Sequence, residues 1–254
     1  MKFWNVWETV FHDTKGDMSK YDYVCMLTHI HPEVVENILY LGSASYVMLP
    51  GVPESRRVVA TALRIKIPRY RDVAVTVRVE IPRAATYVRE SDGTEIEDQI
   101  NWFGITTRAL TSNIWSAYLF YIRKNGRIEF GIHEMHDGTS RDPIVKTPDL
   151  PEVAAQPVTL RIKVEGDCIQ TWANDRQRHD ERDRDRRFIR QGDIYLITYG
   201  VQAKIHEVEV KVKKWYAPFV RVGRKIGKTT LIILAILSGI AGLIYLYHYF
   251  IKPS

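Results

Sequence analysis

The clearest pattern along the chain is a two-residue alternation of apolar and polar positions. In residues 72–81, DVAVTVRVEI, every second residue is Val or Ile, and the residues between them include Thr76, Arg78 and Glu80. Successive side chains of a strand point to opposite faces, so this segment is predicted to be a half-buried strand of an antiparallel sheet. Similar alternation occurs in residues 35–49, 58–67, 100–110, 115–123, 128–132, 158–164, 168–174, 193–200 and 203–215.

Turn residues separate these segments at short intervals. Asn125-Gly126 stands between residues 115–123 and 128–132, which predicts a hairpin with a type I′ turn. Glu165-Gly166-Asp167 separates the next pair in the same way. No amphipathic helix is evident before residue 216. The predicted fold class is therefore all-β, a two-sheet antiparallel jelly-roll sandwich followed by one C-terminal transmembrane helix.

A long apolar stretch near the C-terminus is the basis for that helix. Residues 229–251 contain no Asp, Glu, Lys or Arg. At about 1.5 Å per helical residue they match the roughly 30 Å hydrocarbon core of a bilayer. Four basic residues that precede the stretch are predicted to lie at the membrane surface: Arg221, Arg224, Lys225 and Lys228. Small residues four apart within it are predicted to permit helix packing: Ala235, Ser238, Gly239 and Gly242.

These features define the expected organisation of the chain. The N-terminal residues do not resemble a signal peptide, so a tail anchor is expected, with a single-pass membrane topology and the main domain on the cytoplasmic side. An extracellular or virion-surface domain is the alternative. Trp4, Trp7, Val10 and Phe11 have helical spacing, and the segment is expected to dock on the domain, with a short amphipathic helix as the alternative. The predicted parts are an aromatic segment 1–10, a sandwich 11–215, a basic joint 216–228 and the helix 229–251.

Composition and charge narrow the range of partners. Hydrophobic residues make up 45% and charged residues 26% of the chain, as in a globular protein. The formal net charge is +6. Because four of the basic residues precede the apolar stretch, the excess favours an anionic lipid surface over nucleic acid. Cys25 and Cys168 have no metal-like spacing, and whether they pair stays open.

Several strand and turn motifs together resemble a known family. They are FHDTKGDMSKYDYV at 11–24, IEFGI after the predicted hairpin, TLRIKVEGD at 159–167, and GDIYLITYG at 192–200 followed by IHEVEV. Over residues 11–213 this order resembles the concanavalin A-like (laminin-G-like) jelly-roll superfamily, especially its sugar-hydrolase-like and lectin-like branches. The resemblance is a pattern of strands and turns, so it implies a fold far more than a function.

The resemblance also indicates which catalytic residues to look for. Glycoside hydrolases on this fold carry carboxylates along one strand, in a Glu-x-Asp-x-x-Glu pattern. The nearest candidates are Glu95 and Glu97, which would share a face of a strand but lack the central Asp and the third carboxylate. They follow Ser91-Asp92-Gly93, so a solvated loop or hairpin is the preferred interpretation of this segment. We therefore predict no catalytic residue here and no enzyme.

Metal and cofactor sites are not predicted either. Side chains able to ligate a metal occur in two short segments, His29, His31, His133, Glu134, His136 and Asp137. Their spacing matches no defined zinc or calcium motif, so loop polarity is the preferred interpretation. No phosphate-binding loop or dinucleotide fingerprint is present, and no cofactor is expected.

Aromatic residues with polar companions are the more promising feature. Rings stack on sugars in lectin-like jelly rolls, and the candidates for ligand binding are Trp102, Trp115, Tyr118, Trp172, Asn174 and Arg176. The alternative is that these rings only pack the core and the sheet edges. Residues 175–190 mix arginines with carboxylates and are expected to form a solvated loop, with protein docking as the alternative.

The functional expectation follows from the predicted anchor and the missing carboxylates. It is a membrane-anchored, non-catalytic binding or structural subunit of a larger membrane or envelope assembly. Its expected partners are the lipid bilayer and other proteins or a second copy, with a glycan as a further candidate. The alternatives are a membrane-tethered glycan-binding lectin-like protein, a glycoside hydrolase-like enzyme and a virion membrane protein.

Overall fold

A computed structural model of the chain describes most of residues 5–215. The described ranges are 5–25, 31–47, 60–88, 92–97, 100–110, 113–133, 135–136, 139–140, 144–147, 149–154, 157–184 and 191–215. No helix in these ranges is long and apolar enough to cross a bilayer. The predicted membrane helix 229–251 lies outside them, as do all the residues predicted to contact the membrane surface or to pack helices.

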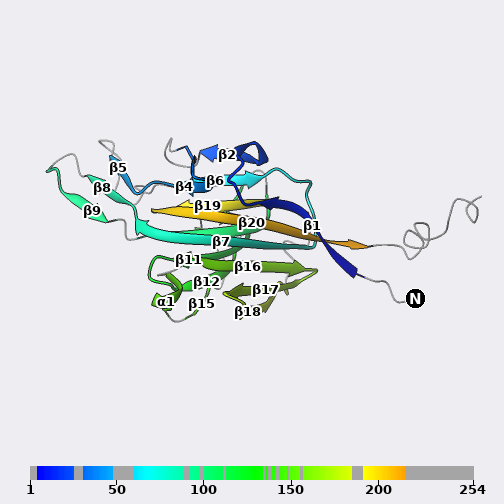
Figure 1. The fold of residues 1–254 in the computed structure, drawn as a ribbon. Coiled ribbons are helices and arrows are strands. Elements are labelled where there is room, and N and C mark those ends of the chain that lie inside the picture. The colour runs from blue at the N-terminus through cyan, green and yellow to red at the C-terminus, as the bar shows by residue number, and fades with distance from the viewer. Residues whose placement is uncertain are drawn as a thin grey trace, which may run out of the picture. The chain divides into compact units, whose positions relative to one another are not determined.

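One of the two main sheets contains eight strands within the described residues. Figure 1 shows β16, β7 and β20 side by side in this layer. In spatial order the sheet runs β18 (Arg176–Arg182), β17 (Cys168–Ala173), β16 (Val158–Glu165), β7 (Val73–Ala84), β20 (Val201–Trp215), β4 (Ile38–Leu41) and β3 (Glu33–Val35), with β1 (Asn5–Asp13) also paired to β20.

The other main sheet contains seven strands in the described part of the chain. Its order is β15 (Ile144–Lys146), β12 (Ile128–His133), β11 (Ala117–Arg123), β10 (Trp102–Ala109), β19 (Asp193–Tyr199), β6 (Ala60–Ile65) and β2 (Tyr21–Cys25). All its pairings are antiparallel.

Shorter elements complete the described fold. A three-stranded sheet of β5 (Ser45–Val47), β8 (Thr86–Val88) and β9 (Glu95–Glu97) lies beyond one end of β7 (Figure 1). β13 (Met135–His136) pairs with β14 (Thr139–Ser140). The helical elements are a 3₁₀ turn, Met18–Lys20, and α1 (Pro151–Ala154). Both main sheets belong to a compact unit, Glu8–Val212, and of a second unit, Met1–Trp7 with Lys213–Ser254, only the ends of β1 and β20 are described.

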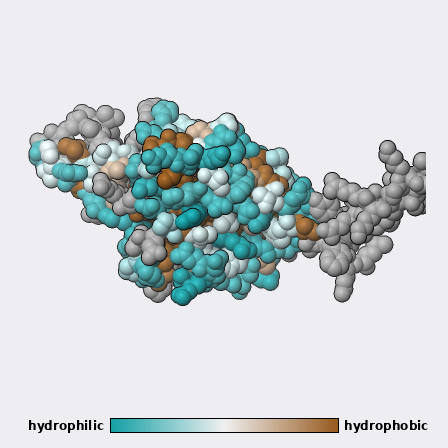
Figure 2. All heavy atoms as spheres, in the orientation of Figure 1, coloured by the Kyte–Doolittle hydropathy of each residue, from teal (hydrophilic) through white to brown (hydrophobic). Residues whose placement is uncertain are grey.

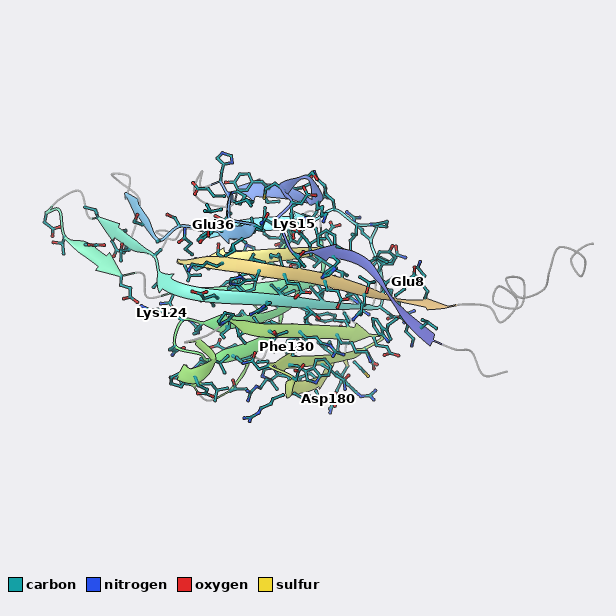
Figure 3. The ribbon with its side chains drawn as sticks, in the orientation of Figure 1. Glu8, Lys15, Glu36, Lys124, Phe130 and Asp180 are labelled. Atoms are coloured by element: carbon teal, nitrogen blue, oxygen red, sulfur yellow. The ribbon has the colours of Figure 1, made fainter. Side chains whose placement is uncertain are left out.

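The main hydrophobic core lies between the two large sheets. The alternating valines of β7 are buried and face residues from β10, β11, β12 and β19. Phe130 of β12 is part of this core, whereas Asp180 lies on the edge strand β18 (Figure 3). The face visible in Figure 2 is mostly hydrophilic, with small separate hydrophobic patches. The predicted all-β antiparallel sandwich is therefore confirmed.

Two local predictions, the turn type at Asn125-Gly126 and the loop at residues 175–190, are changed by the structure, and two alternatives that the sequence left open are decided. The Asn125-Gly126 hairpin between β11 and β12 is present, but Asn125 does not have the positive φ that a type I′ turn requires, and Gly126 alone in this turn does. Residues 5–13 form strand β1, which pairs with β20, so the alternative of a short helix there is not adopted. Residues 176–182, expected to be loop, form the edge strand β18, whose charges suit an edge exposed to solvent. Cys168 is a free thiol, so it forms no bridge with Cys25.

The hairpin glycine is required both by its backbone conformation and by its surroundings. Gly126 has a φ of +85°, and a Cβ there would lie 1.9 Å from the carbonyl oxygen of Leu150. We expect Gly126→Ala to lower the free energy of unfolding by about 3 kcal/mol or more, because strain and a backbone clash add. Gly93 is the matched control, with a φ of +69° and no atom within 4 Å of the added Cβ. Gly93→Ala should cost about 1 kcal/mol in urea titrations. Equal decreases in the free energy of unfolding for Gly126→Ala and Gly93→Ala would contradict this explanation.

A histidine lies inside the sandwich between aromatic rings. His179 of β18 is 4% exposed, and its ring centroid lies 6.2 Å from that of Phe120 and 6.0 Å from that of Phe130. Its Nδ1 is 2.7 Å from the hydroxyl of Thr171. Burial, reinforced by the charge of Arg178, lowers the pKa of His179 to about 4. The ring is therefore neutral in the folded protein over most of the acidic range.

This histidine makes the stability depend on pH. The unfolded chain takes up a proton near pH 6.5, whereas the folded chain does so only near pH 4, so stability is fully present above pH 6.5 and falls as the pH drops to about 4. The loss should reach up to about 3 kcal/mol. His179→Asn, which keeps a polar group for Thr171, should reduce this loss. Denaturant titrations at pH 7, 5.5 and 4.5 test the prediction, and equal pH dependence in both proteins would contradict it.

Candidate functional site

The central strands of the seven-stranded sheet, β10, β11 and β19, are buried on both faces. Every residue of β10 is buried. Alternation places Phe103 and Ile105 in the core between the sheets, while Trp102, Gly104 and Thr106 point outward. A second hydrophobic cluster lies on this outer face, and all its fully buried members come from β6, β10, β11 and β19. We call this surface, which carries the rings of Trp102, Trp115, Tyr121 and Tyr199, the aromatic face.

Four rings meet on the aromatic face around Trp102. Trp102 is parallel to Tyr199 at 5.5 Å between ring centroids, and lies 5.1 Å from Tyr121 and 6.1 Å from Trp115. Gly104 permits this arrangement, because a Cβ there would lie 3.0 Å from the Trp102 ring. Trp102 and Tyr121 are buried, whereas Trp115 and Tyr199 are half-buried. The latter two rings are therefore the ones that reach solvent.

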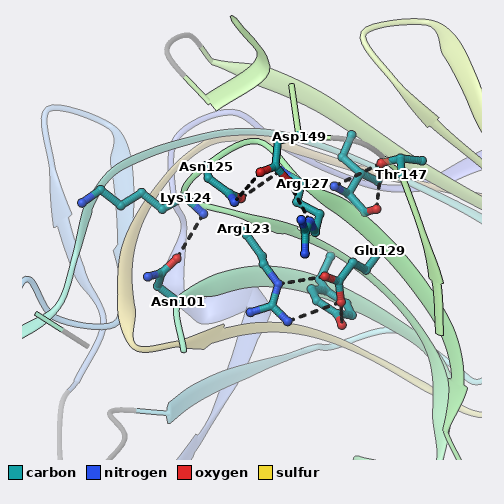
Figure 4. A network of polar contacts seen from close by, with 10 residues as sticks. Asn101, Arg123, Lys124, Asn125, Arg127, Glu129, Thr147 and Asp149 are labelled. Carbon is teal, nitrogen blue, oxygen red and sulfur yellow. Dashed lines mark hydrogen bonds and ion pairs between the residues drawn. The ribbon is translucent and has the colours of Figure 1, made fainter. Parts of the chain in front are cut away.

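A buried carboxylate stands beside this cluster, on β12. Glu129 faces Tyr121 of β11 in the strand register and is 0% exposed. Arg123 Nε donates to Glu129 Oε1 at 2.9 Å, and Arg123 Nη2 donates to Oε2 at 3.4 Å. The Tyr121 hydroxyl donates to Oε2 as well. Figure 4 shows Arg123 directed at the carboxylate.

The pKa shifts of the donors reflect this contact. Burial raises the pKa of Tyr121, and the hydrogen bond to Glu129 raises it further, so the phenol stays protonated. Burial works to lower the pKa of Arg123, but the hydrogen bonds and the charge of Glu129 outweigh it and leave the pKa above its usual value. The buried carboxylate thus has a charge partner and a neutral donor, as buried charges require.

Exposed polar pairs lie at the β11–β12 turn, next to the strand that carries the carboxylate (Figure 4). Lys124 Nζ lies 2.7 Å from Glu97 Oε1, which ties β9 of the small sheet to this turn. The Lys124 backbone N–H donates to the side-chain oxygen of Asn101. Arg127 Nε donates to Asp149 at 2.7 Å. These pairs place the small sheet and the turn at the same end of the aromatic face as Trp102.

The far side of the same face is charged. Asp22 of β2 accepts hydrogen bonds from Arg64 of β6 and forms an ion pair with Lys66. Arg69 binds both carboxylate oxygens of Asp193 at 2.9 and 3.0 Å. Each of these carboxylates already has a basic partner, and neither lies next to Glu129 in the strand register.

The residues predicted to bind a ligand are divided between three surfaces. Trp102 and Trp115 lie together on the aromatic face. Tyr118 points into the core between the sheets, where its hydroxyl donates to Asp183 at 2.8 Å. It is therefore not on the aromatic face. Tyr121 lies three residues further along β11, and because successive side chains of a strand alternate, it points to the opposite face of the sheet from Tyr118.

The other predicted ligand-binding residues lie on the eight-stranded sheet. The ring of Trp172, on β17, is contacted by the guanidinium of Arg161 at 4.4 Å. Asn174 has a φ of +47° in the turn to β18, and its side chain accepts from the backbone of Thr159. Arg176 is exposed at the start of β18. The predicted group of six thus does not form one site, and its ligand-binding role stays a prediction.

The other chemistry-bearing candidates are also separated from the aromatic face. Glu95 and Glu97 are exposed on β9 of the small sheet. Within the described residues, no group of three or more His, Cys, Asp or Glu side chains comes together to hold a metal. His29, Glu134 and Asp137 lie outside the described residues.

Sequence reasoning missed Glu129, although a signal was present. Residues 129–134 read Glu-Phe-Gly-Ile-His-Glu, which matches the outer two positions of Glu-x-Asp-x-x-Glu, with Gly131 in place of the central Asp. The segment directly follows a hairpin and two strongly apolar strands, so it is expected to pair into the same sheet, and it forms β12 between β11 and the edge strand β15. Glu95 and Glu97 have no such context.

Comparison with known proteins supports the architecture. No protein-family model matches the sequence, and no curated protein matches it. Among solved structures, the endo-β-1,3-glucanase from Pyrococcus furiosus aligns at a TM-score of 0.56 and 10% identity, over 83% of this chain and 96% of that one. The laminarinase from Rhodothermus marinus aligns at a TM-score of 0.56 and 12% identity, over 83% of this chain and 99% of that one. A prokaryotic β-1,3-1,4-glucanase derived from a mouse hindgut metagenome aligns at a TM-score of 0.53 and 10% identity, over 81% of this chain and 99% of that one.

The described sandwich has the concanavalin A-like jelly-roll fold. At these identities the likeness shows the fold alone. It still corrects the functional expectation from the sequence, which favoured a non-catalytic binding or structural subunit and no enzyme. The similar structures are endo-glucanases, and they fit the glycoside hydrolase-like alternative better than that expectation.

Proposed function

We propose that the protein is a glycoside hydrolase-like enzyme that acts on β-linked glucan, with Glu129 as its reacting carboxylate. The observation that carries the proposal is a buried carboxylate, hydrogen-bonded by Arg123 and Tyr121, beside a cluster of aromatic rings on the outer face of the seven-stranded sheet. The substrate class rests on the fold likeness to endo-β-1,3-glucanases and a β-1,3-1,4-glucanase.

The chemistry follows the two-carboxylate pattern of retaining glycosidases. The ionised oxygen of Glu129 attacks the anomeric carbon, the bond from that carbon to the glycosidic oxygen breaks, and the leaving oxygen takes a proton from a carboxylic acid. Water then attacks the resulting ester, returns a proton to that acid and frees Glu129. The reaction needs the second carboxyl about 5–5.5 Å away.

Glu134 is the proposed second carboxyl. The support is its spacing in the sequence, five residues after Glu129, because Glu134 lies outside the described residues. Gly131 leaves the position between them without a side chain. Trp115 and Tyr199, the half-buried rings of the aromatic face, are the proposed stacking surfaces for sugar rings.

Replacing the reacting carboxylate tests the proposal. We expect the full chain to release reducing ends from a soluble β-1,3-glucan, and Glu129→Gln to lower the rate at least 10³-fold, because an amide is a far weaker nucleophile. Glu95→Gln, on the exposed strand β9, is the control and should retain the wild-type rate. The measurement is reducing-sugar release over several hours at pH 5 to 7.

Three results would contradict the proposal. One is an absence of hydrolysis by the full chain on β-1,3-, β-1,3-1,4- and β-1,4-linked glucans. Another is glucan binding without turnover, which would indicate a binding protein. The third is equal activity of Glu129→Gln and the wild type, which would place the reaction elsewhere.

We further propose that residues 229–251 hold this enzyme at a membrane, with the sandwich on the cytoplasmic side. The support is their uncharged, apolar composition and the preceding basic residues, all read from the sequence.

Fractionation of cells tests the membrane proposal. We expect the full chain to stay in the membrane pellet after alkaline carbonate extraction, and a chain ending at residue 215 to appear in the supernatant. Protease added to sealed vesicles with the cytoplasmic face outward should digest the sandwich. Extraction of the full chain by carbonate, or protection of the sandwich in those vesicles, would contradict the proposal.

A further inference from the structure

The two oxygens of Glu129 have different partners. Oε1 accepts from Arg123 Nε at 2.9 Å, a normal charge-assisted hydrogen bond. Oε2 accepts from the Tyr121 hydroxyl and, at the longer distance of 3.4 Å, from Arg123 Nη2. Among these three contacts, Arg123 makes its shorter hydrogen bond to Oε1, and Oε2 accepts from the neutral phenol as well as from the more distant Nη2.

Three strands carry the described residues whose charge bears on Glu129. On β11, Arg123 is a cation in direct contact, and the protonated Tyr121 adds a neutral donor. On β12 itself, Gly131 contributes no charge two residues along the same face. On β15, Lys146 is opposite Glu129 in the backbone register, and its side chain lies outside the described residues.

Nearby basic residues at the β11–β12 turn have carboxylate partners of their own. Lys124 pairs with Glu97, and Arg127 pairs with Asp149. Both pairs are about half exposed, so they are screened by solvent. Glu129, by contrast, is 1% exposed as a side chain and Arg123 is 28% exposed. Contact with Arg123 thus acts on Glu129 far more strongly than the outer pairs do.

We infer that Arg123 is the positioning residue that keeps Glu129 ionised and oriented for attack, with Oε1 anchored and Oε2 delivered to the sugar when the Tyr121 hydroxyl is displaced. This inference rests on the proposed function. It differs from the carboxylate-rich Glu-x-Asp-x-x-Glu arrangement, because a carboxylate at position 131 would disfavour the charged form of Glu129, whereas a guanidinium favours it.

The roles of the two donors are separable by mutation. Arg123→Gln should lower kcat on a soluble β-1,3-glucan about 100-fold, because the reacting oxygen of Glu129 is misplaced. KM should change little, because Arg123 is not proposed to contact the bound sugar. It should also move the acid limb of the pH–rate profile upward by at least about one pH unit, since the opposite charge is lost. Compared with Arg123→Gln, Arg123→Lys should have a pH–rate profile close to that of the wild type, because it keeps the positive charge, but should recover only part of the wild-type kcat. Tyr121→Phe should change kcat less than about 10-fold.

Lys124→Gln is the matched control, because it removes a neighbouring basic residue that pairs with Glu97 and not with Glu129. It should leave kcat and the pH profile as in the wild type. Thermal unfolding of each variant shows whether it is folded at the assay temperature. Should Arg123→Gln not fold, Arg123→Lys provides the test, and an unchanged kcat in the lysine variant would overturn the inference.

A spectroscopic titration separates this inference from the proposed function. In the full chain labelled with ¹³C at glutamate side-chain carboxyls, the Glu129 signal is assigned by its absence in Glu129→Gln. We expect this signal to titrate at a higher pH in Arg123→Gln than in the wild type. Equal titration midpoints would overturn the role of Arg123, even if hydrolysis is observed. A clear difference without any hydrolysis would support the role and leave the proposed function contradicted.

Discussion

The burial of both faces of the central strands of the seven-stranded sheet is the constraint on which the other features depend. One face packs against the eight-stranded sheet, and the other is covered by its own aromatic residues. A polar group inside such a layer is largely withdrawn from water in the unliganded protein, so it must find its partners on the neighbouring strands. Glu129 meets this requirement through Arg123 and Tyr121 on the next strand. Its placement therefore follows from register as much as from sequence.

The sandwich itself was predictable from residue patterns. The alternating valines of β7 face the core as expected, and Asn125-Gly126 joins β11 to β12. Residues 176–182 show why polarity alone misleads, because an edge strand needs charged side chains for the same reason that a loop tolerates them. The dipeptide Asn125-Gly126 predicted the place of the turn but not its type, because Gly126 alone of the two has a positive φ.

The candidate site was harder to predict because it depends on strand pairing. Strand period alone separates Tyr118 from Tyr121, but only the register shows that Tyr121 lies opposite Glu129. Trp172 and Trp102 both lie in alternating strand segments of the sequence, but β17 and β10 belong to different sheets, so the two rings lie on separate surfaces. The spacing of Glu129 and Glu134 was visible, yet Gly131 interrupts the expected carboxylate pattern and concealed it.

The most direct measurement of the central claim is covalent trapping of the reacting carboxylate. A 2-deoxy-2-fluoro glucosyl fluoride forms an ester with the nucleophile of a retaining glycosidase and releases fluoride, and the ester then hydrolyses slowly. Intact mass spectrometry followed by peptide mapping of the full chain should locate one sugar on Glu129, and none on the Glu129→Gln variant. Absence of labelling, or labelling of another carboxylate, would contradict the assignment of Glu129 as the nucleophile.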